Sequence, residues 1–298
     1  MRKPIVDIQE MITAIATLGG EITHIEPVQD GEESFAFRVI IFGKKYVLRA
    51  NHDIHGFEKD DFVCRRFAGP ALPIPEIEAI GVLDNGVAWC LSVLVPGVTL
   101  QDLPVAALPS VTGAVDEVMK AIAAAPLDGM SGFGPFNAQG HGRYTSWKAY
   151  LESIVNDPLY NWQEAGKRVP MKRILPLQEQ LLQSVAACPE IRQLVHGDFG
   201  SNNVLTDGHL VTGVIDWSEA MIGDSLYDMA NIFFWRTWLD CMEYQARYFE
   251  AFPLDKARLA CYQLRIGLEQ VYQTAIDGAT DDLDWALLRC EHLAGLSR

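Results

Sequence analysis

The chain has 298 residues, of which 49% are hydrophobic, a composition that suits one or two substantial cores and excludes a disordered or fibrous protein. Its 24 basic and 39 acidic side chains give a net charge of -15, which repels nucleic acid and anionic membrane surfaces. No segment holds about twenty uninterrupted apolar residues. We therefore expect a soluble, cytoplasmic monomer with no nucleic-acid or membrane partner.

The first hundred residues are rich in strands. β-Branched and aromatic runs at 35–42 and 46–50 predict a hairpin, and helical spacing predicts a helix over 57–67. Two more strands are expected at 77–83 and 87–94, on either side of an Asp-Asn-Gly turn. This part of the chain therefore predicts a small antiparallel sheet that carries one helix.

Helices dominate after residue 97. Apolar residues at helical spacing predict five of them, at 109–124, 146–155, 174–187, 224–235 and 257–276. The pattern indicates an α+β chain of two lobes, 1–96 and 97–298, joined by a hinge at the Pro96-Gly97 break.

The six cysteines are scattered, without the paired spacing or the neighbouring histidines that a zinc site or a disulfide framework needs. They predict buried free thiols, at Cys64, Cys90, Cys188, Cys241, Cys261 and Cys290.

The segment HGDFGSNNVL, at 196–205, carries the clearest chemical signal. Asp198 precedes Asn203 by five residues, and Asp216 follows thirteen residues later in VIDWSEA. The chain between Asn203 and Asp216 reads as two short strands around an Asp-Gly turn, so a hairpin brings both residues to one place. A carboxylate that orients a hydroxyl, next to two oxygen ligands for Mg²⁺, is what phosphoryl transfer requires. We therefore expect Asp198 as the catalytic residue and Asn203 and Asp216 as metal ligands.

His196, at the start of this motif, is expected to brace the loop by hydrogen bonds instead of taking part in catalysis. Asp228, about one turn into the helix predicted at 224–235, is expected to point back toward the same loop. Both residues therefore have a supporting role in this hypothesis.

The segment GEESFAF, at 31–37, lies where a loop that covers a nucleotide would precede the paired strands. Its Gly31, Glu33 and Ser34 are the expected contacts to ATP or GTP phosphates, although a plain strand connection is as good an interpretation of the segment alone. Arg49, at the end of a strand, is the cation best placed for the α- and β-phosphates, and Asp60 on the next helix is its expected partner.

Aromatic and acidic residues near the end of the chain indicate a binding site for a cationic ring compound. Indole rings offer flat apolar surfaces for a sugar or aminocyclitol ring, and carboxylates attract ammonium groups. The expected acceptor-binding residues are Asn202, Glu219, Trp235, Trp238, Asp240 and Glu243.

The two motifs HGDFGSNNVL and VIDWSEA resemble those of the aminoglycoside phosphotransferase family. GVTLQDLP, SGFGPF and NIFFW have no general catalytic reason to recur, and they are similar to the members of that family that act on hygromycin B. The resemblance spans nearly the whole chain. It implies a protein-kinase-like fold, ATP with Mg²⁺, and transfer of the γ-phosphate to a hydroxyl of a small cationic antibiotic, most closely hygromycin B, as a means of antibiotic resistance. Arg49 departs from the lysine of protein kinases, and Asp60 from the glutamate.

Two alternatives stay open at this point. A kinase for another small molecule, such as a different aminoglycoside, a macrolide, choline or a sugar, would carry the same catalytic motif. A nucleotide-binding protein without catalysis is a second alternative, against which the intact Asp198, Asn203 and Asp216 argue.

Overall fold

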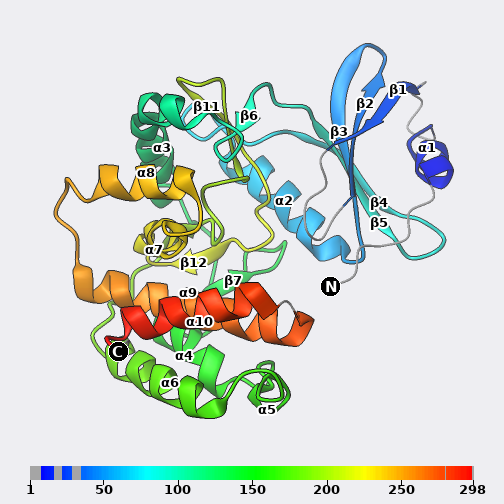
Figure 1. The fold of residues 1–298 in the computed structure, drawn as a ribbon. Helices are drawn as coiled ribbons and strands as arrows, with labels where there is room; N and C mark the ends of the chain where they lie inside the picture. Colours follow the sequence, from blue (N-terminus) through cyan, green and yellow to red (C-terminus); the bar gives the residue numbers. More distant parts are fainter. Residues whose placement is uncertain (1–7, 17–21, 29–34, 279, 297–298) are drawn as a thin grey trace.

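The computed structural model describes residues 8–16, 22–28, 35–278 and 280–296, which form a five-stranded sheet and a larger helical part (Figure 1). The sheet has the order β1-β2-β3-β5-β4, and all neighbouring strands are antiparallel. The strands are β1 Ile22–Pro27, β2 Phe35–Ile41, β3 Lys44–Asn51, β4 Ile77–Val82 and β5 Ala88–Val93. The two predicted hairpins are confirmed, as is the α+β class.

The β2–β3 turn is shorter than expected. Only Phe42 and Gly43 connect the strands, at φ values of 48° and 77°, and Lys44 and Lys45 already belong to β3. Two left-handed residues give a tight turn whose twist matches that of the flanking strands.

Two helices cover opposite faces of the sheet (Figure 1). α1, Ile8–Ala16, packs Met11 and Ile15 against the core that includes Leu91. α2, Ile54–Phe67, packs Phe57 against Cys90 on the other face. Cys90 and Leu91 are successive residues of β5, so their side chains point to opposite faces of the sheet. α2 covers the face that is turned toward the helical part, and it therefore lies between the sheet and the rest of the molecule (Figure 1).

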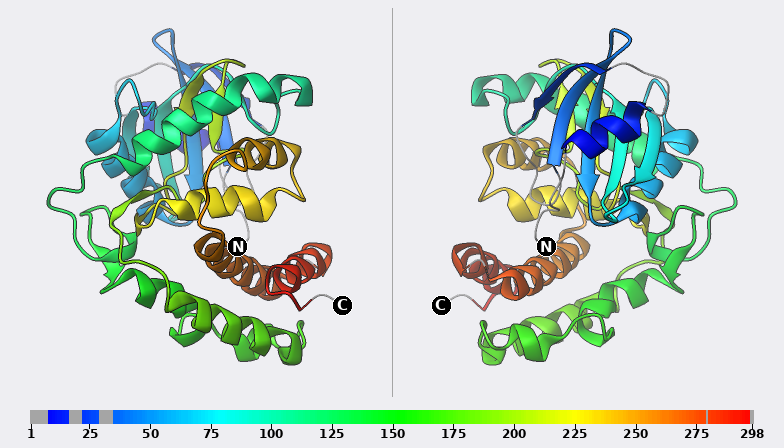
Figure 2. Two further views of the ribbon diagram at one scale, coloured as in Figure 1. Left: turned by 90° about the vertical axis from the view of Figure 1, so that its left-hand side faces the viewer. Right: turned by 90° about the vertical axis from the view of Figure 1, so that its right-hand side faces the viewer.

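The helical part contains every helix that the sequence predicts in this region. The predicted helices correspond to α3 Leu108–Ala123, α4 Trp147–Asn156, α6 Met171–Val185, α7 Leu226–Trp235 and α9 Lys256–Asp277. The 3-10 helix η1, Val105–Ala107, and the short α5, Trp162–Ala165, lie between them. Figure 2 shows the five-stranded sheet at one end of the molecule, with α4, α6, α9 and the last helix, α10 at Thr280–Leu293, toward the other.

Two further helices, α8 at Asp240–Phe249 and α10 at Thr280–Leu293, were not predicted. Charged residues interrupt the apolar pattern of both, so their buried faces are hard to recognise from the sequence. α10 packs along α9, where a side chain at Gly267 would approach Cys290 Sγ to 2.4 Å. The close approach of these helices therefore needs a glycine at this position.

Two small sheets position the segments that carry the predicted chemistry. One has the order β11-β10-β6, and the other β8-β7-β12-β9. Their strands are β6 Val98–Thr99, β7 Phe133–Phe136, β8 Gly142–Tyr144, β9 Gln193–Val195, β10 Val204–Thr206, β11 Val211–Val214 and β12 Met221–Gly223. The HGDFGSNN loop runs from β9 to β10, and the DWSEA loop runs from β11 to β12. The sheets therefore bring the two loops together.

Among the residues that the structure describes, no helix is both long and apolar enough to cross a membrane. All six cysteines are buried and free, as predicted.

Candidate active site

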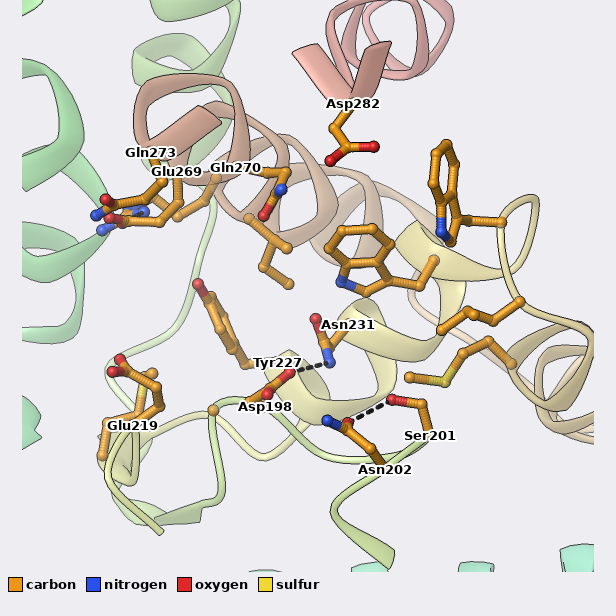
Figure 3. A pocket seen from close by; sticks show the side chains of 18 of the residues that line it. Asp198, Ser201, Asn202, Glu219, Tyr227, Asn231, Glu269, Gln270, Gln273 and Asp282 are labelled. Carbon is orange, nitrogen blue, oxygen red and sulfur yellow. Dashed lines mark hydrogen bonds and ion pairs between the residues drawn. The ribbon is translucent and has the colours of Figure 1, made fainter. Parts of the chain in front are cut away.

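Asp198 is held in the loop between β9 and β10 by two amide side chains. Asn203 Nδ2 donates to Asp198 Oδ2 at 2.8 Å and to the Asp198 backbone oxygen at 2.9 Å. Asn231 Nδ2, on α7, donates to Asp198 Oδ1 at 3.4 Å. The carboxylate is thus fixed through both oxygens while it faces a large cavity (Figure 3).

The β10–β11 hairpin brings Asn203 next to the segment that carries Asp216. The Ile215 N–H donates to the Asn203 backbone oxygen at 3.0 Å. Because Asn203 Nδ2 binds Asp198, its Oδ1 is the side-chain atom left for a cation. This oxygen and the Asp216 carboxylate suit Mg²⁺, which takes further ligands from water and phosphate. Within the described ranges, no group of three or more His, Cys, Asp or Glu side chains is arranged so that it could hold a metal ion.

Asp216 adopts a left-handed backbone conformation, with φ of 59°. Non-glycine residues rarely adopt it, because it costs roughly 1–2 kcal/mol, so neighbouring contacts must support it. One such contact is the Ser218 hydroxyl, which donates to Asp216 Oδ1 at 2.8 Å.

His196 connects the two loops. It is fully buried, its Nε2–H donates to the Ile215 oxygen at 3.0 Å, and its Nδ1 accepts the Asp198 N–H at 3.3 Å. Burial lowers the pKa of His196 to about 4, so the ring is neutral near pH 7. This geometry fits the bracing role expected for His196.

Asp228 supports the same loop from α7. Its carboxylate accepts the N–H groups of His196 and Gly197 at 2.9 and 2.8 Å, as the sequence predicts for a brace. Burial raises the pKa of Asp228 to about 7, against the opposing effect of these two donors.

Arg49 and Asp60 form an ion pair between β3 and α2. Asp60 is buried, and its Oδ1 also accepts the Trp217 N–H at 2.7 Å. Burial raises the pKa of Asp60. Burial alone would lower the pKa of Arg49, but the charge of Asp60 outweighs this effect and raises it. The pair therefore connects the sheet, α2 and the loop of Asp216.

The ion pair lines a narrow cleft together with Asp216. Most of the other lining is apolar, as a flat uncharged ring requires. The apolar lining residues are Val47, Ile74, Pro75, Ile77, Val93, Leu94, Val95, Leu205, Val214, Ile215 and Trp217.

Asp198 lines a second, wider cavity of about 590 Å³ between the β9–β10 loop, α7, α9 and α10 (Figure 3). Among the residues that the structure describes, four carboxylates line it, from Asp198, Glu219, Glu269 and Asp282. Six aromatic side chains lie around them, from Tyr150, Tyr160, Tyr227, Trp235, Trp238 and Trp285. The lining thus offers negative charge and flat apolar surfaces, as expected for a cationic ring compound.

The arginine in this lining is neutralised by a carboxylate. Arg265 is fully buried, its guanidinium binds Glu269 Oε2 at 2.5 Å and Tyr160 Oη at 3.2 Å, and it lies 4.9 Å from the Tyr150 ring centroid. Burial alone would lower the pKa of Arg265, but Glu269 and the tyrosines raise it well above its usual value. The charge is therefore paired beneath the cavity.

Of the predicted acceptor-binding residues, Asn202, Glu219, Trp235 and Trp238 line the wide cavity. Trp235 stacks on Trp285 with ring centroids 5.0 Å apart. Burial raises the pKa of Glu219, while Lys59 opposes that effect.

The structure does not bring Asp240 or Glu243 into this cavity, which corrects the expectation for both. They begin α8, and Glu243 forms ion pairs with Arg236 at 2.7 Å and Arg247 at 2.6 Å. Its charge is therefore already balanced by Arg236, just after α7, and by Arg247 on α8.

The predicted phosphate contacts Gly31, Glu33 and Ser34 lie outside the described residues.

Several side chains at the site were not predicted. Glu269 and Asp282 replace Asp240 and Glu243 as acids of the cavity, and Asn231 holds Asp198. Lys59 Nζ, on α2, donates to the Ser218 oxygen at 2.7 Å, and burial lowers the pKa of Lys59 to about 8. The one signal in the sequence was that Lys59 stands beside Asp60, which was already assigned to the site.

The sequence profile of the phosphotransferase enzyme family, APH, matches residues 24–262. The hygromycin-B 4-O-kinase of Escherichia coli is 49% identical over 273 residues, which cover 91% of this chain and 80% of that protein.

Solved structures are also similar. A thermostable mutant of aminoglycoside phosphotransferase APH(4)-Ia, in a ternary complex with AMP-PNP and hygromycin B, is 47% identical with a TM-score of 0.92, covering 96% of this chain and 98% of that one. APH(4)-Ia itself is 45% identical with a TM-score of 0.93, covering 98% and 100%. The GDP and kanamycin complex of APH(2")-IIIa is 16% identical with a TM-score of 0.66, covering 97% and 99%, which shows the fold alone.

Proposed function

This chain belongs to the phosphotransferase enzyme family, and we propose that it transfers the γ-phosphate of ATP to a hydroxyl of hygromycin B, which inactivates the antibiotic. The observation that carries the proposal is that Asp198, held through both carboxylate oxygens, faces a cavity lined by acids and indoles. The 49% identity with a hygromycin-B 4-O-kinase supports the choice of substrate. ATP as donor indicates a cytoplasmic reaction.

Asp198 is proposed to accept a hydrogen bond from the attacking hydroxyl. Asn203 and Asn231 hold the carboxylate in one orientation, so the hydroxyl oxygen is aimed instead of being fully deprotonated. This role suits a loose transition state, in which positioning contributes more than proton removal.

The donor groups in the narrow cleft fit a nucleotide with Mg²⁺. Asn203 and Asp216 would hold the metal, which neutralises charge on the phosphates when bound. Arg49 is proposed to bind the α- and β-phosphates, while Asp60 keeps its guanidinium in place. The apolar lining is proposed to hold the base. In this proposal residues 1–96 form the nucleotide lobe, and 97–298 carry the catalytic loop and the acceptor.

The wide cavity is proposed to bind the antibiotic. Ammonium groups of the substrate would pair with Glu219 and Asp282, because Glu269 already binds Arg265. The rings of the substrate would lie on Trp235 and Trp238. The acidic lining and the net charge of -15 both favour a polycationic ligand.

The test is incubation of the protein with ATP, Mg²⁺ and hygromycin B, followed by mass spectrometry and mapping of the modified position. The expected result is addition of one phosphoryl group. A parallel panel of other aminoglycosides, a macrolide and choline distinguishes the alternatives. Phosphorylation of a panel compound without any on hygromycin B would overturn the proposed substrate.

A further inference from the structure

α2 contacts the loop of Asp216 through two consecutive side chains. Asp60 Oδ1 accepts the Trp217 N–H at 2.7 Å, and Lys59 Nζ donates to the Ser218 oxygen at 2.7 Å. The helix lies close to the loop here, since a side chain at Gly56 would meet Ser218 Cβ at 3.5 Å. Two neighbouring residues of the loop, Trp217 and Ser218, are thus fixed from one helix, one through its N–H and the other through its backbone oxygen.

The ammonium group of Lys59 is buried and lies among carboxylates whose charge it offsets. The residue is 5% exposed, and Nζ lies 4.7 Å from the centroid of the Phe136 ring. The carboxylates of Glu219, Asp60 and Asp216 all attract this charge. A lysine is rarely buried to this extent unless such partners offset its desolvation.

The four residues 216–219, which we call the 216–219 segment, connect the two binding regions. Asp216 lines the narrow cleft at one end, and Glu219 lines the wide cavity at the other. Lys59 binds the oxygen of Ser218, between these ends. Since a left-handed backbone such as that of Asp216 needs support from its surroundings, a contact at this point can hold the backbone that carries both carboxylates.

We propose that Lys59 is a positioning residue that holds the 216–219 segment, so that Asp216 meets the metal and Glu219 meets the cationic acceptor. The inference rests on the proposed function, because it assigns ligands to both ends of the segment. Lys59 itself contacts neither ligand in this proposal.

The test is Lys59→Met, which keeps the length of the side chain and removes its donor and charge. In the first measurement, AMP-PNP affinity is determined at increasing Mg²⁺ concentrations without hygromycin B. The Mg²⁺ requirement is the concentration at which half of the Mg²⁺-dependent increase in affinity is reached. This concentration is expected to rise about tenfold, the effect of losing one charge-assisted hydrogen bond. In turnover assays the KM for hygromycin B is expected to rise as well, while affinity for AMP-PNP without metal stays unchanged, because Arg49 and Asp60 are intact.

The matched control is Arg65→Met, which removes a cation from the same helix. Arg65 is exposed, and within the described ranges its one ion pair is with Asp61, at 2.8 Å. Its loss should therefore alter neither the Mg²⁺ requirement nor the KM for hygromycin B. A merely structural defect in Lys59→Met would lower the active fraction, and with it kcat, without changing the Mg²⁺ requirement or the KM.

An unchanged Mg²⁺ requirement in folded Lys59→Met overturns the proposal. If that variant does not fold, Lys59→Gln decides by the same criterion, since it removes the charge and keeps a polar group. A wild-type protein that binds AMP-PNP with Mg²⁺ but does not phosphorylate hygromycin B contradicts the proposed function alone, because the metal measurement still tests Lys59.

Discussion

The narrow cleft and the wide cavity differ in both charge and lining. The cleft holds one buried ion pair, Arg49 with Asp60, and is otherwise mostly apolar. In the described part of the chain the cavity has four carboxylates, and Glu269 among them is paired with Arg265. An apolar cleft with one cation suits a flat base and its phosphates, whereas an acidic, aromatic cavity suits a polycation. Under the proposed function the two regions therefore bind different ligands, and they meet at the loops of Asp198 and Asp216.

The largest effect is expected at Asp198, where the two ligands would meet. Asp198→Ala should lower turnover at least about a hundredfold, because an oriented acid–base group is lost. AMP-PNP affinity, measured by calorimetry, should stay unchanged, because the cleft is intact. Asp240→Asn is the matched control, since Asp240 lies outside the cavity lining. Comparable turnover in Asp198→Ala would remove this carboxylate from the reaction.

The next effect concerns the buried pair of the cleft. Asp60→Ala should lower the free energy of unfolding by about 3–5 kcal/mol, because it leaves Arg49 buried without its partner. The neighbouring Asp61 forms a more exposed pair with Arg65, so Asp61→Ala should cost only about 0–1 kcal/mol. Urea denaturation measures both, and equal losses would contradict the distinction between them.

His196 links the loops of the two regions and should make stability depend on pH. Its pKa is about 4 in the folded chain and 6.5 in the reference state, so unfolded chains bind its proton first as the pH falls. Its contribution, about 3 kcal/mol from these two values, is present above pH 6.5 and lost as the pH falls toward 4. Urea denaturation of His196→Gln and of wild type at several pH values isolates the contribution of His196 to the free energy of unfolding. Asp228, whose raised pKa gives the opposite pH dependence, is present in both proteins.

The control for this pH dependence is His209→Gln, because His209 is exposed. That variant should follow the wild-type curve. A constant difference between wild type and His196→Gln from pH 7 to pH 4 would show that His196 is not buried in its neutral form.

The smallest effect is expected at the wall of the cavity. Trp235→Ala should raise the KM for the acceptor about tenfold, the equivalent of roughly 1.4 kcal/mol for a lost aromatic contact. Trp235→Phe keeps a ring and should lose less. The KM for ATP, from steady-state kinetics, should not change in either variant. An equal rise in both constants would mean that the two regions are not independent.

The sequence predicted the local parts of this site well. The hairpin between Asn203 and Asp216 consists of a turn and two short strands, which residues close together in the sequence form. The pair of Arg49 and Asp60 was also predicted, because a strand and the helix that follows it pack together. The acids Asp240 and Glu243 were not placed correctly. Arg247 follows Glu243 by four residues on α8 and could have been recognised as its partner, but the contact with Arg236, outside that helix, depends on packing.

The sequence by itself determined the reaction class, since the spacing of Asp198, Asn203 and Asp216 is typical of phosphoryl transfer; in the structure Asn203 binds Asp198 and lies next to the segment that carries Asp216. Only the tertiary structure decided which distant side chains complete the site. Glu269 and Asp282 come from α9 and α10, and Lys59 comes from α2. Helical periodicity shows which residues share a face, but the packing of whole helices against one another decides what that face meets.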